Sequence, residues 1–196
     1  MSSETTVRVV RIIDDIKVIR ILADPMRREI LRLVAEHPLT EAQLSVKLKL
    51  SKPSIGHHLR ILLNTGLIRV ERTEVEAHGI QQKYYASTFK LLLENFDSAP
   101  PELQRYFVHT HMERLRGILS VIQLMEEKRG RAIEITLNQL EDLSLEIARQ
   151  ISIVAKQYEK KEVDMSRETL LVKIYSETLK KIVAEHKWPP LRALEL

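Results

Sequence analysis

A cluster of basic and hydroxyl side chains between residues 51 and 60 could contact a polyanion. A helix is expected to begin at about Lys52, because the Ser51 hydroxyl can accept hydrogen bonds from first-turn N–H groups. Pro53 is tolerated there, because first-turn N–H groups lack intrahelical partners. Cationic and hydrogen-bonding side chains of this kind suit contacts with phosphates and base edges. The candidates are Ser51, Lys52, Ser54, His57, His58 and Arg60.

This helix has one apolar and one polar face. At about 100° per residue, three side chains form a narrow stripe that should pack on the domain. They are Ile55, Leu59 and Leu62. Arg60 and His57 fall on the opposite side, and the helix contains no acidic residue. Arg60 is the expected base reader, because a guanidinium can bind guanine through two hydrogen bonds.

The neighbouring elements predict a winged helix-turn-helix. Thr40, with a glutamine three residues later, forms a capping box for a preceding helix, and the spacer 49–51 is short. Residues 67–73 and 80–86 have the composition of paired strands, with residues 74–79 as the hairpin tip. In this architecture the second helix is the recognition helix and lies in the DNA major groove. The side chains expected to contact the major groove are those of Lys52, Ser54, His57 and Arg60.

Three residues of this helix allow further interpretation. Ser51 and His58 are expected to assist at phosphates, although His58 flanks the apolar stripe and could instead hydrogen-bond at the domain edge. Gly56 should destabilise the middle of a helix by about 1 kcal/mol relative to alanine. This cost indicates a close approach to a backbone.

The hairpin carries charges of both signs. Arg69, Arg72 and Lys83 could contact the DNA backbone. Phosphates would repel the neighbouring acids, which are Glu71, Glu74 and Glu76. The alternative is a solvated hairpin in which Arg69 and Arg72 pair with these acids.

Four motifs in this region resemble the ArsR-type winged-helix regulators. Residues 23–31 (ADPMRREIL) resemble the first long helix of that family, and residues 50–59 (LSKPSIGHHL) resemble its recognition helix. Residues 64–68 (NTGLI) and 83–85 (KYY) complete the pattern in the same order. The resemblance spans roughly residues 7–90, and the starting strand with the long helical C-terminus most resembles archaeal members. It implies a DNA-binding transcriptional regulator.

The net charge of +4 is distributed unevenly along the 196 residues. Residues 1–96 carry 15 Lys and Arg against 11 Asp and Glu, whereas residues 97–196 carry 16 against 16. All of the excess positive charge therefore lies in the winged-helix half. This asymmetry is expected of a phosphate-binding domain joined to a neutral one.

Cysteine and hydropathy exclude several classes of protein. The chain has no cysteine, which excludes disulfides, cysteine-ligated zinc and thiol redox sensing within it. No apolar run approaches the roughly 18 residues of a membrane span, and the N-terminus lacks the pattern of a secretion signal. A cytoplasmic protein without membrane contact is expected.

The polar, proline-containing segment 97–101 predicts a boundary between domains 1–96 and 97–196. Before the recognition region, residues 6–13 are expected to form a strand covering the edge of the wing sheet. Helices are expected over 14–22, with Ile16, Ile19 and Leu22 inward, and from Pro25, capped by Asp24.

Three long amphipathic helices are predicted after this boundary, over residues 102–128, 135–161 and 167–187. They have more apolar surface than one small domain can bury, so a homodimer through the C-terminal helices is expected. The preferred contact is coiled-coil-like packing through the middle helix. A monomeric helical bundle is the alternative.

Catalytic and metal sites are not expected. The sequence lacks a glycine-rich phosphate loop, a nucleophile elbow and a metalloprotease helix, so neither an enzyme nor a cofactor is predicted. His109 and His111 would lie about 200° apart on a helix and cannot chelate one metal together. His111 is interpreted as a histidine at the edge of the core. Metal-sensing members of the resembled family use cysteines before the recognition helix, and residues 40–44 contain none.

The predicted fold class is mainly α with a small β wing: an N-terminal winged helix-turn-helix domain and a C-terminal helical dimerisation region. The predicted function is a homodimeric, sequence-specific transcriptional regulator, a repressor that reads a palindromic promoter site on double-stranded DNA. One alternative is a winged-helix adaptor that binds proteins. Another is a regulator gated by a small effector held among the C-terminal helices, or by a metal.

Overall fold

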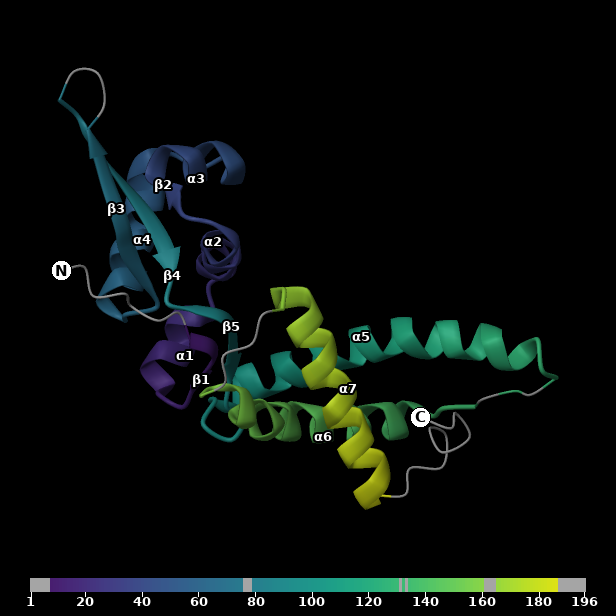
Figure 1. The fold of residues 1–196 in the computed structure, drawn as a ribbon. Helices are drawn as coiled ribbons and strands as arrows, with labels where there is room; N and C mark the ends of the chain where they lie inside the picture. Colours follow the sequence, from purple (N-terminus) through teal and green to yellow (C-terminus); the bar gives the residue numbers. More distant parts are fainter. Residues whose placement is uncertain (1–7, 76–78, 131, 133, 161–164, 187–196) are drawn as a thin grey trace. The chain divides into compact units, whose positions relative to one another are not determined.

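The computed structural model describes residues 8–75, 79–130, 132, 134–160 and 165–186, and the chain divides into two compact units (Figure 1). Unit 1 comprises Met1–Leu93 with Tyr158–Arg167, and unit 2 comprises Glu94–Gln157 with Glu168–Leu196. The predicted fold class, mainly α with a small β wing, is confirmed. The division into domains 1–96 and 97–196 stays a prediction.

Unit 1 contains four helices and five strands among its described residues. In chain order they are β1 (Arg8–Ile13), α1 (Ile16–Leu22), α2 (Pro25–Glu36), β2 (Leu39–Thr40), α3 (Glu41–Leu48), α4 (Lys52–Asn64), β3 (Ile68–Val75), β4 (Gln81–Ser87) and β5 (Phe89–Glu94). The start of α2 is as predicted, because the Asp24 carboxylate accepts a hydrogen bond from the Met26 N–H at 2.8 Å. Ile16 departs from prediction: it lies at the first position of α1 and is 43% exposed.

The wing sheet is antiparallel, with β4 between β2 and β3. β1 pairs with β5 in a separate two-stranded sheet. The prediction that the first strand covers the edge of the wing sheet is therefore wrong, because β2 occupies the side of β4 that β3 leaves open. The predicted hairpin tip at 74–79 is also too long, since β3 continues to Val75. Residues 76–78 of the tip lie outside the described residues.

The core of unit 1 draws side chains from all four of its helices. Its largest fully buried side chains are Ile19 and Leu22 in α1, Ile30 in α2, Leu44 in α3, Ile55, Leu59 and Leu62 in α4, and Leu67 just before β3. Since burial of each such side chain contributes about 1.5 to 3 kcal/mol, this core holds α3 and α4 firmly in place.

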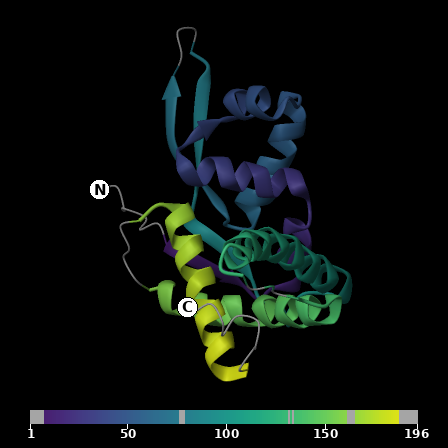
Figure 2. The ribbon, with the colours of Figure 1, turned by 90° about the vertical axis from the view of Figure 1, so that its right-hand side faces the viewer.

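Unit 2 is a bundle of three long helices. They are α5 (Pro101–Glu127), α6 (Leu137–Ala155) and α7 (Arg167–His186), and a short 3-10 helix (Lys156–Tyr158) follows α6. α5 and α6 lie side by side, and α7 packs across them (Figures 1 and 2). The shared core contains Met112 and Leu115, Leu140, Leu143 and Ile147, and Ile182.

Most of the apolar stripe of α6 is buried within unit 2. Leu140, Leu143, Ile147 and Ile151 are all at most 7% exposed. The coiled-coil-like dimer contact preferred from sequence relied on this stripe, which is largely covered within the single chain, and a dimer contact through α6 stays a prediction. α6 also ends at Ala155, earlier than the predicted residue 161, which lies outside the described residues. Among the described residues, every helix is too short or too polar to cross a membrane.

Candidate nucleic-acid interface

α3 begins with the predicted capping box. The Gln43 N–H donates to the Thr40 hydroxyl at 3.2 Å, and the Thr40 N–H donates to the Gln43 side-chain oxygen at 2.9 Å. Two first-turn donors are thus satisfied by a reciprocal pair, which fixes where the helix begins. Its inward residue, Leu44, is fully buried.

The turn between α3 and α4 is held by hydrogen bonds that the sequence pattern did not indicate. Lys49 adopts the left-handed conformation with φ 54°, which a non-glycine residue rarely takes. The Leu50 N–H donates to the Ser45 carbonyl at 3.1 Å, and the Ser45 hydroxyl donates to the Leu50 carbonyl at 2.5 Å. The serine thereby ties both sides of the turn together and sets the direction in which α4 leaves it.

α4 presents the predicted outer face. Ser51 caps it, with its hydroxyl accepting from the Ser54 N–H at 3.4 Å. Ile55, Leu59 and Leu62 are at most 1% exposed, so the apolar stripe points into the core as predicted. The structure brings the predicted side chains together on the solvent side of the helix. Ser51, Lys52, His57 and Arg60 are exposed there, and Ser54 is half-buried.

His58 lies at the domain edge, not on the outer face. Its side chain is 13% exposed, and its Nδ1 atom is 3.8 Å from the Asp24 carboxylate that caps α2. This distance is too long for a hydrogen bond, but a protonated imidazole would form an ion pair there. Of the two interpretations open from sequence, the domain-edge position is observed, but the hydrogen bond expected there is not, because the buried Nδ1 atom has no hydrogen-bond partner among the described residues. Its assistance at phosphates stays a prediction.

The wing arginines are engaged with neighbouring acids. Arg69 contacts the Glu71 carboxylate at 2.6 Å, and Arg72 contacts Glu74 at 2.7 Å. The hydrogen bond from Arg72 holds the pKa of the Glu74 carboxyl below its usual value. The Arg72 guanidinium also lies 3.8 Å from the centroid of the Tyr84 ring. These contacts match the alternative of a solvated, internally paired hairpin, whereas Lys83 is simply exposed on β4.

The close neighbour of Gly56 is a side chain of α3. A Cβ atom added at Gly56 would lie 3.3 Å from the Glu41 Oε1 atom, so within this chain the approach is to a carboxylate and not to a backbone. The capping box could have revealed this neighbour, because it puts Glu41 at the first position of the helix that packs beside α4. Glu41 suits that position, since a carboxylate at a helix N-terminus is stabilising.

Gly56→Ala is expected to stabilise the protein by up to about 1 kcal/mol, the difference in helix propensity between the two residues. The Glu41 carboxylate is the end of a flexible side chain and can move by a few tenths of an ångström. Urea unfolding of both proteins measures the change. In a Glu41→Ala background the same substitution should give the full gain, and a loss of stability there would contradict the prediction.

Metal-binding and catalytic residues were not predicted, and the structure adds one observation. Among the residues that it describes, no group of three or more His, Cys, Asp and Glu side chains is arranged to hold a metal ion.

Comparison with known proteins relates the helix-turn-helix to bacterial and archaeal regulators. Residues 24–70, which contain α2 to α4 and the start of β3, match the family described as bacterial regulatory protein, arsR family. Over 85 residues, 43% of this chain and 88% of the relative, the chain is 29% identical to an uncharacterised HTH-type transcriptional regulator of Methanocaldococcus jannaschii.

Two solved structures are also similar. One is reduced HlyU from Vibrio cholerae, at 27% identity over 36% of this chain and 67% of that chain, with a TM-score of 0.30. The other is the adhesin competence repressor AdcR from Streptococcus pyogenes, at 15% identity over 73% of this chain and 91% of that chain, with a TM-score of 0.31.

Proposed function

We propose that this chain, a DNA-binding transcriptional regulator with an ArsR-family helix-turn-helix, is a repressor. It acts as a cytoplasmic homodimer that occupies a palindromic promoter site. The outer face of α4 carries this proposal. Lys52, His57 and Arg60 are exposed there, and α4 contains no acidic residue. Such a face is complementary to phosphates and to the hydrogen-bond acceptors of guanine in the major groove.

The proposed dimer contact is an apolar surface near the end of α5. Val121, Leu124 and Met125, here termed the α5 stripe, are 58%, 61% and 55% exposed. Their spacing of three and four residues puts them on one side of the helix. A second copy packed antiparallel would cover them. Residues 97–196 carry 16 Lys and Arg against 16 Asp and Glu, so the C-terminal regions of two copies do not repel each other strongly.

A two-fold dimer suits the proposed site on DNA. Two recognition helices related by a two-fold axis read the two halves of a palindrome, about one helical turn apart. Occupation of such a site in a promoter would block access by RNA polymerase, which supports repression as the proposed sign of regulation.

Fluorescence anisotropy on labelled DNA from the gene's own upstream region tests the function. The protein should bind this DNA in preference to a scrambled competitor. The logarithm of its affinity should fall linearly with the logarithm of salt concentration, with a slope that corresponds to several phosphate contacts per dimer. Equal, weak binding to both DNAs would exclude that promoter as a target. No binding to either DNA at low salt would overturn the proposal.

Arg60→Ala is expected to weaken binding to the preferred site by about 1 to 3 kcal/mol, roughly 5- to 150-fold. Its exposed guanidinium is the group on α4 that can bind guanine with two hydrogen bonds. Arg60→Lys is the matched control, because it keeps the charge but loses the planar fork. The lysine variant should retain the salt slope and still lose base preference in a binding-site selection. An unchanged selected motif in the alanine variant would refute this role.

The ion pairs within the wing hairpin favour one other function. Because Arg69 and Arg72 already contact Glu71 and Glu74, the hairpin offers little free positive charge to DNA. A winged helix can also bind proteins, and an adaptor of this kind is the second candidate. It becomes the leading one if the anisotropy experiment detects no binding to DNA.

A further inference from the structure

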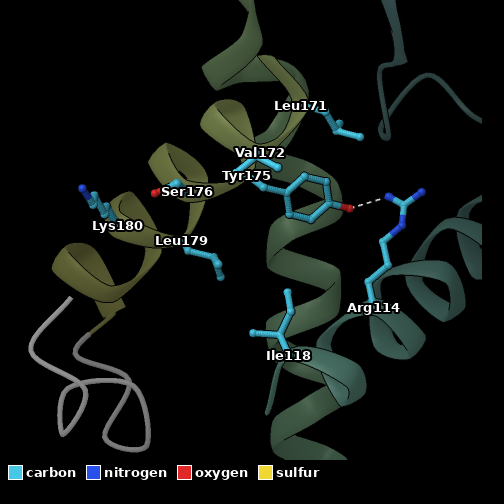
Figure 3. Close-up of a pocket in the computed structure, with 8 residues that line it drawn as sticks. All are labelled: Arg114, Ile118, Leu171, Val172, Tyr175, Ser176, Leu179 and Lys180. Carbon is cyan, nitrogen blue, oxygen red and sulfur yellow. Dashed lines mark hydrogen bonds between the residues drawn. The ribbon is translucent and has the colours of Figure 1, made fainter. Parts of the chain in front are cut away.

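Unit 2 contains a pocket between α5 and α7 (Figure 3). Its volume is about 510 Å³, within the range of roughly 300 to 1,000 Å³ typical of small-molecule sites. Its walls are mainly apolar, formed by Ile118 of α5 and by Leu171, Val172 and Leu179 of α7. Ile118 and Val172 are 44% and 68% exposed, so a ligand can reach the pocket from solvent.

Arg114 is positioned at one end of this pocket by a short chain of hydrogen bonds (Figure 3). Its Nη1 atom donates to the Tyr175 hydroxyl at 2.5 Å, and that hydroxyl lies 2.6 Å from His111 Nδ1. A guanidinium can only donate, so the hydroxyl accepts from Arg114 and its own proton remains available to an unprotonated His111 Nδ1. Tyr175 uses one of the five N–H donors of Arg114, which leaves the others for a ligand.

Within the described part of the chain, the positive charge of Arg114 has no acidic partner. Among the described residues, no carboxylate lies within ion-pair distance of Arg114, or of Lys180 at the other end of the pocket. By contrast, Arg116 and Arg129 in the same unit are paired with glutamates. An unneutralised guanidinium beside an apolar wall is complementary to a molecule that joins an anionic group to an apolar body.

We propose that this pocket binds a small amphipathic carboxylate. The carboxylate would pair with the Arg114 guanidinium, and the apolar chain would lie along Ile118, Leu171 and Leu179. The Tyr175 hydroxyl holds the guanidinium in place before the ligand arrives, which lowers the entropy lost on binding.

Calorimetric titration of the full chain with decanoate, below its micelle concentration, tests this site without DNA. Saturable binding of one decanoate per chain is expected, and the charge-reversed decyltrimethylammonium should bind at least about tenfold more weakly. Arg114→Gln should weaken decanoate binding by about tenfold or more. Arg116→Gln is the matched control, since it removes an exposed arginine of the same helix that does not line the pocket.

Three results would overturn the proposal. The first is equal binding of decanoate and the cation, and the second is equal loss of affinity in both arginine variants. The third is absence of decanoate binding, and dissociation of the dimer by Val172→Asp would then assign this surface to a second copy.

A role for this ligand as an effector rests on the proposed regulatory function, whereas binding itself does not. Anisotropy on the preferred DNA, with and without decanoate, measures the effector role separately. If the chain binds decanoate but does not bind DNA, the proposed regulatory function is wrong and the proposed ligand site stands.

Discussion

Val121→Asp is expected to convert the proposed dimer into monomers and to weaken operator binding by at least about a hundredfold. Val121 is 58% exposed in the single chain and lies at the middle of the α5 stripe. In a two-fold dimer each interface would receive two carboxylates, and a buried charge without a partner costs about 3 to 5 kcal/mol, or about two to four decades in affinity. Since a monomer reads one half-site only, the affinity for the palindrome falls with the dimer.

Sedimentation equilibrium and anisotropy measure these two effects together. Gln123→Glu is the matched control, because it adds the same charge two residues along the chain, about 160° around α5 from Val121. That variant should remain dimeric and should bind the operator normally. A dimeric Val121→Asp protein would show that copies associate through another surface.

Local chemistry made the recognition region predictable. Thr40 and Ser51 each satisfy N–H groups a few residues away, so the starts of α3 and α4 depend on neighbours in sequence alone. The burial of Ile55, Leu59 and Leu62 follows from helical periodicity in the same way. The outer face of α4 could therefore be assigned without knowledge of any distant contact.

Contacts between distant segments were the part that could not be predicted. β1 pairs with β5, about eighty residues later, and an apolar strand does not specify which sheet edge it joins. The α6 stripe was indistinguishable in sequence from that of α5, yet α6 is covered by its neighbours while Val121, Leu124 and Met125 are not. Periodicity shows that a helix has an apolar face and leaves open what covers it.

The pocket beside Arg114 shows the same contrast between local contacts, which could be predicted, and distant contacts, which could not. His111 was correctly interpreted from sequence as a core-edge residue, and it is 8% exposed. Its partner Tyr175 is 64 residues away on α7, so neither the hydrogen bond nor the pocket beside it has a signal in the local pattern.

Protein stability is expected to fall by about 3 kcal/mol as the pH is lowered from 6.5 to 4, through His111 alone. Burial, together with the nearby charge of Arg114, lowers the pKa of His111 from 6.5 to about 4. In the unfolded chain the imidazole takes up a proton below pH 6.5, whereas in the folded chain it stays neutral until about pH 4. The unfolded state therefore binds more protons between pH 6.5 and 4. The contribution of neutral His111 to the free energy of unfolding is fully present above pH 6.5 and is lost as the pH falls.

Burial and the nearby charge of Arg114 explain why the folded state resists this proton. The Tyr175 hydroxyl lies 2.6 Å from His111 Nδ1 and shares this buried site. Urea unfolding at pH 7.5, 5.5 and 4.5 measures the dependence in the wild type, in His111→Gln and in His109→Gln. The His111 variant should show a shallower fall in stability with pH, while substitution of the exposed His109 on the same helix should retain the wild-type dependence. Equal pH dependence in all three proteins would mean that His111 accepts a proton as readily in the folded chain as in the unfolded one.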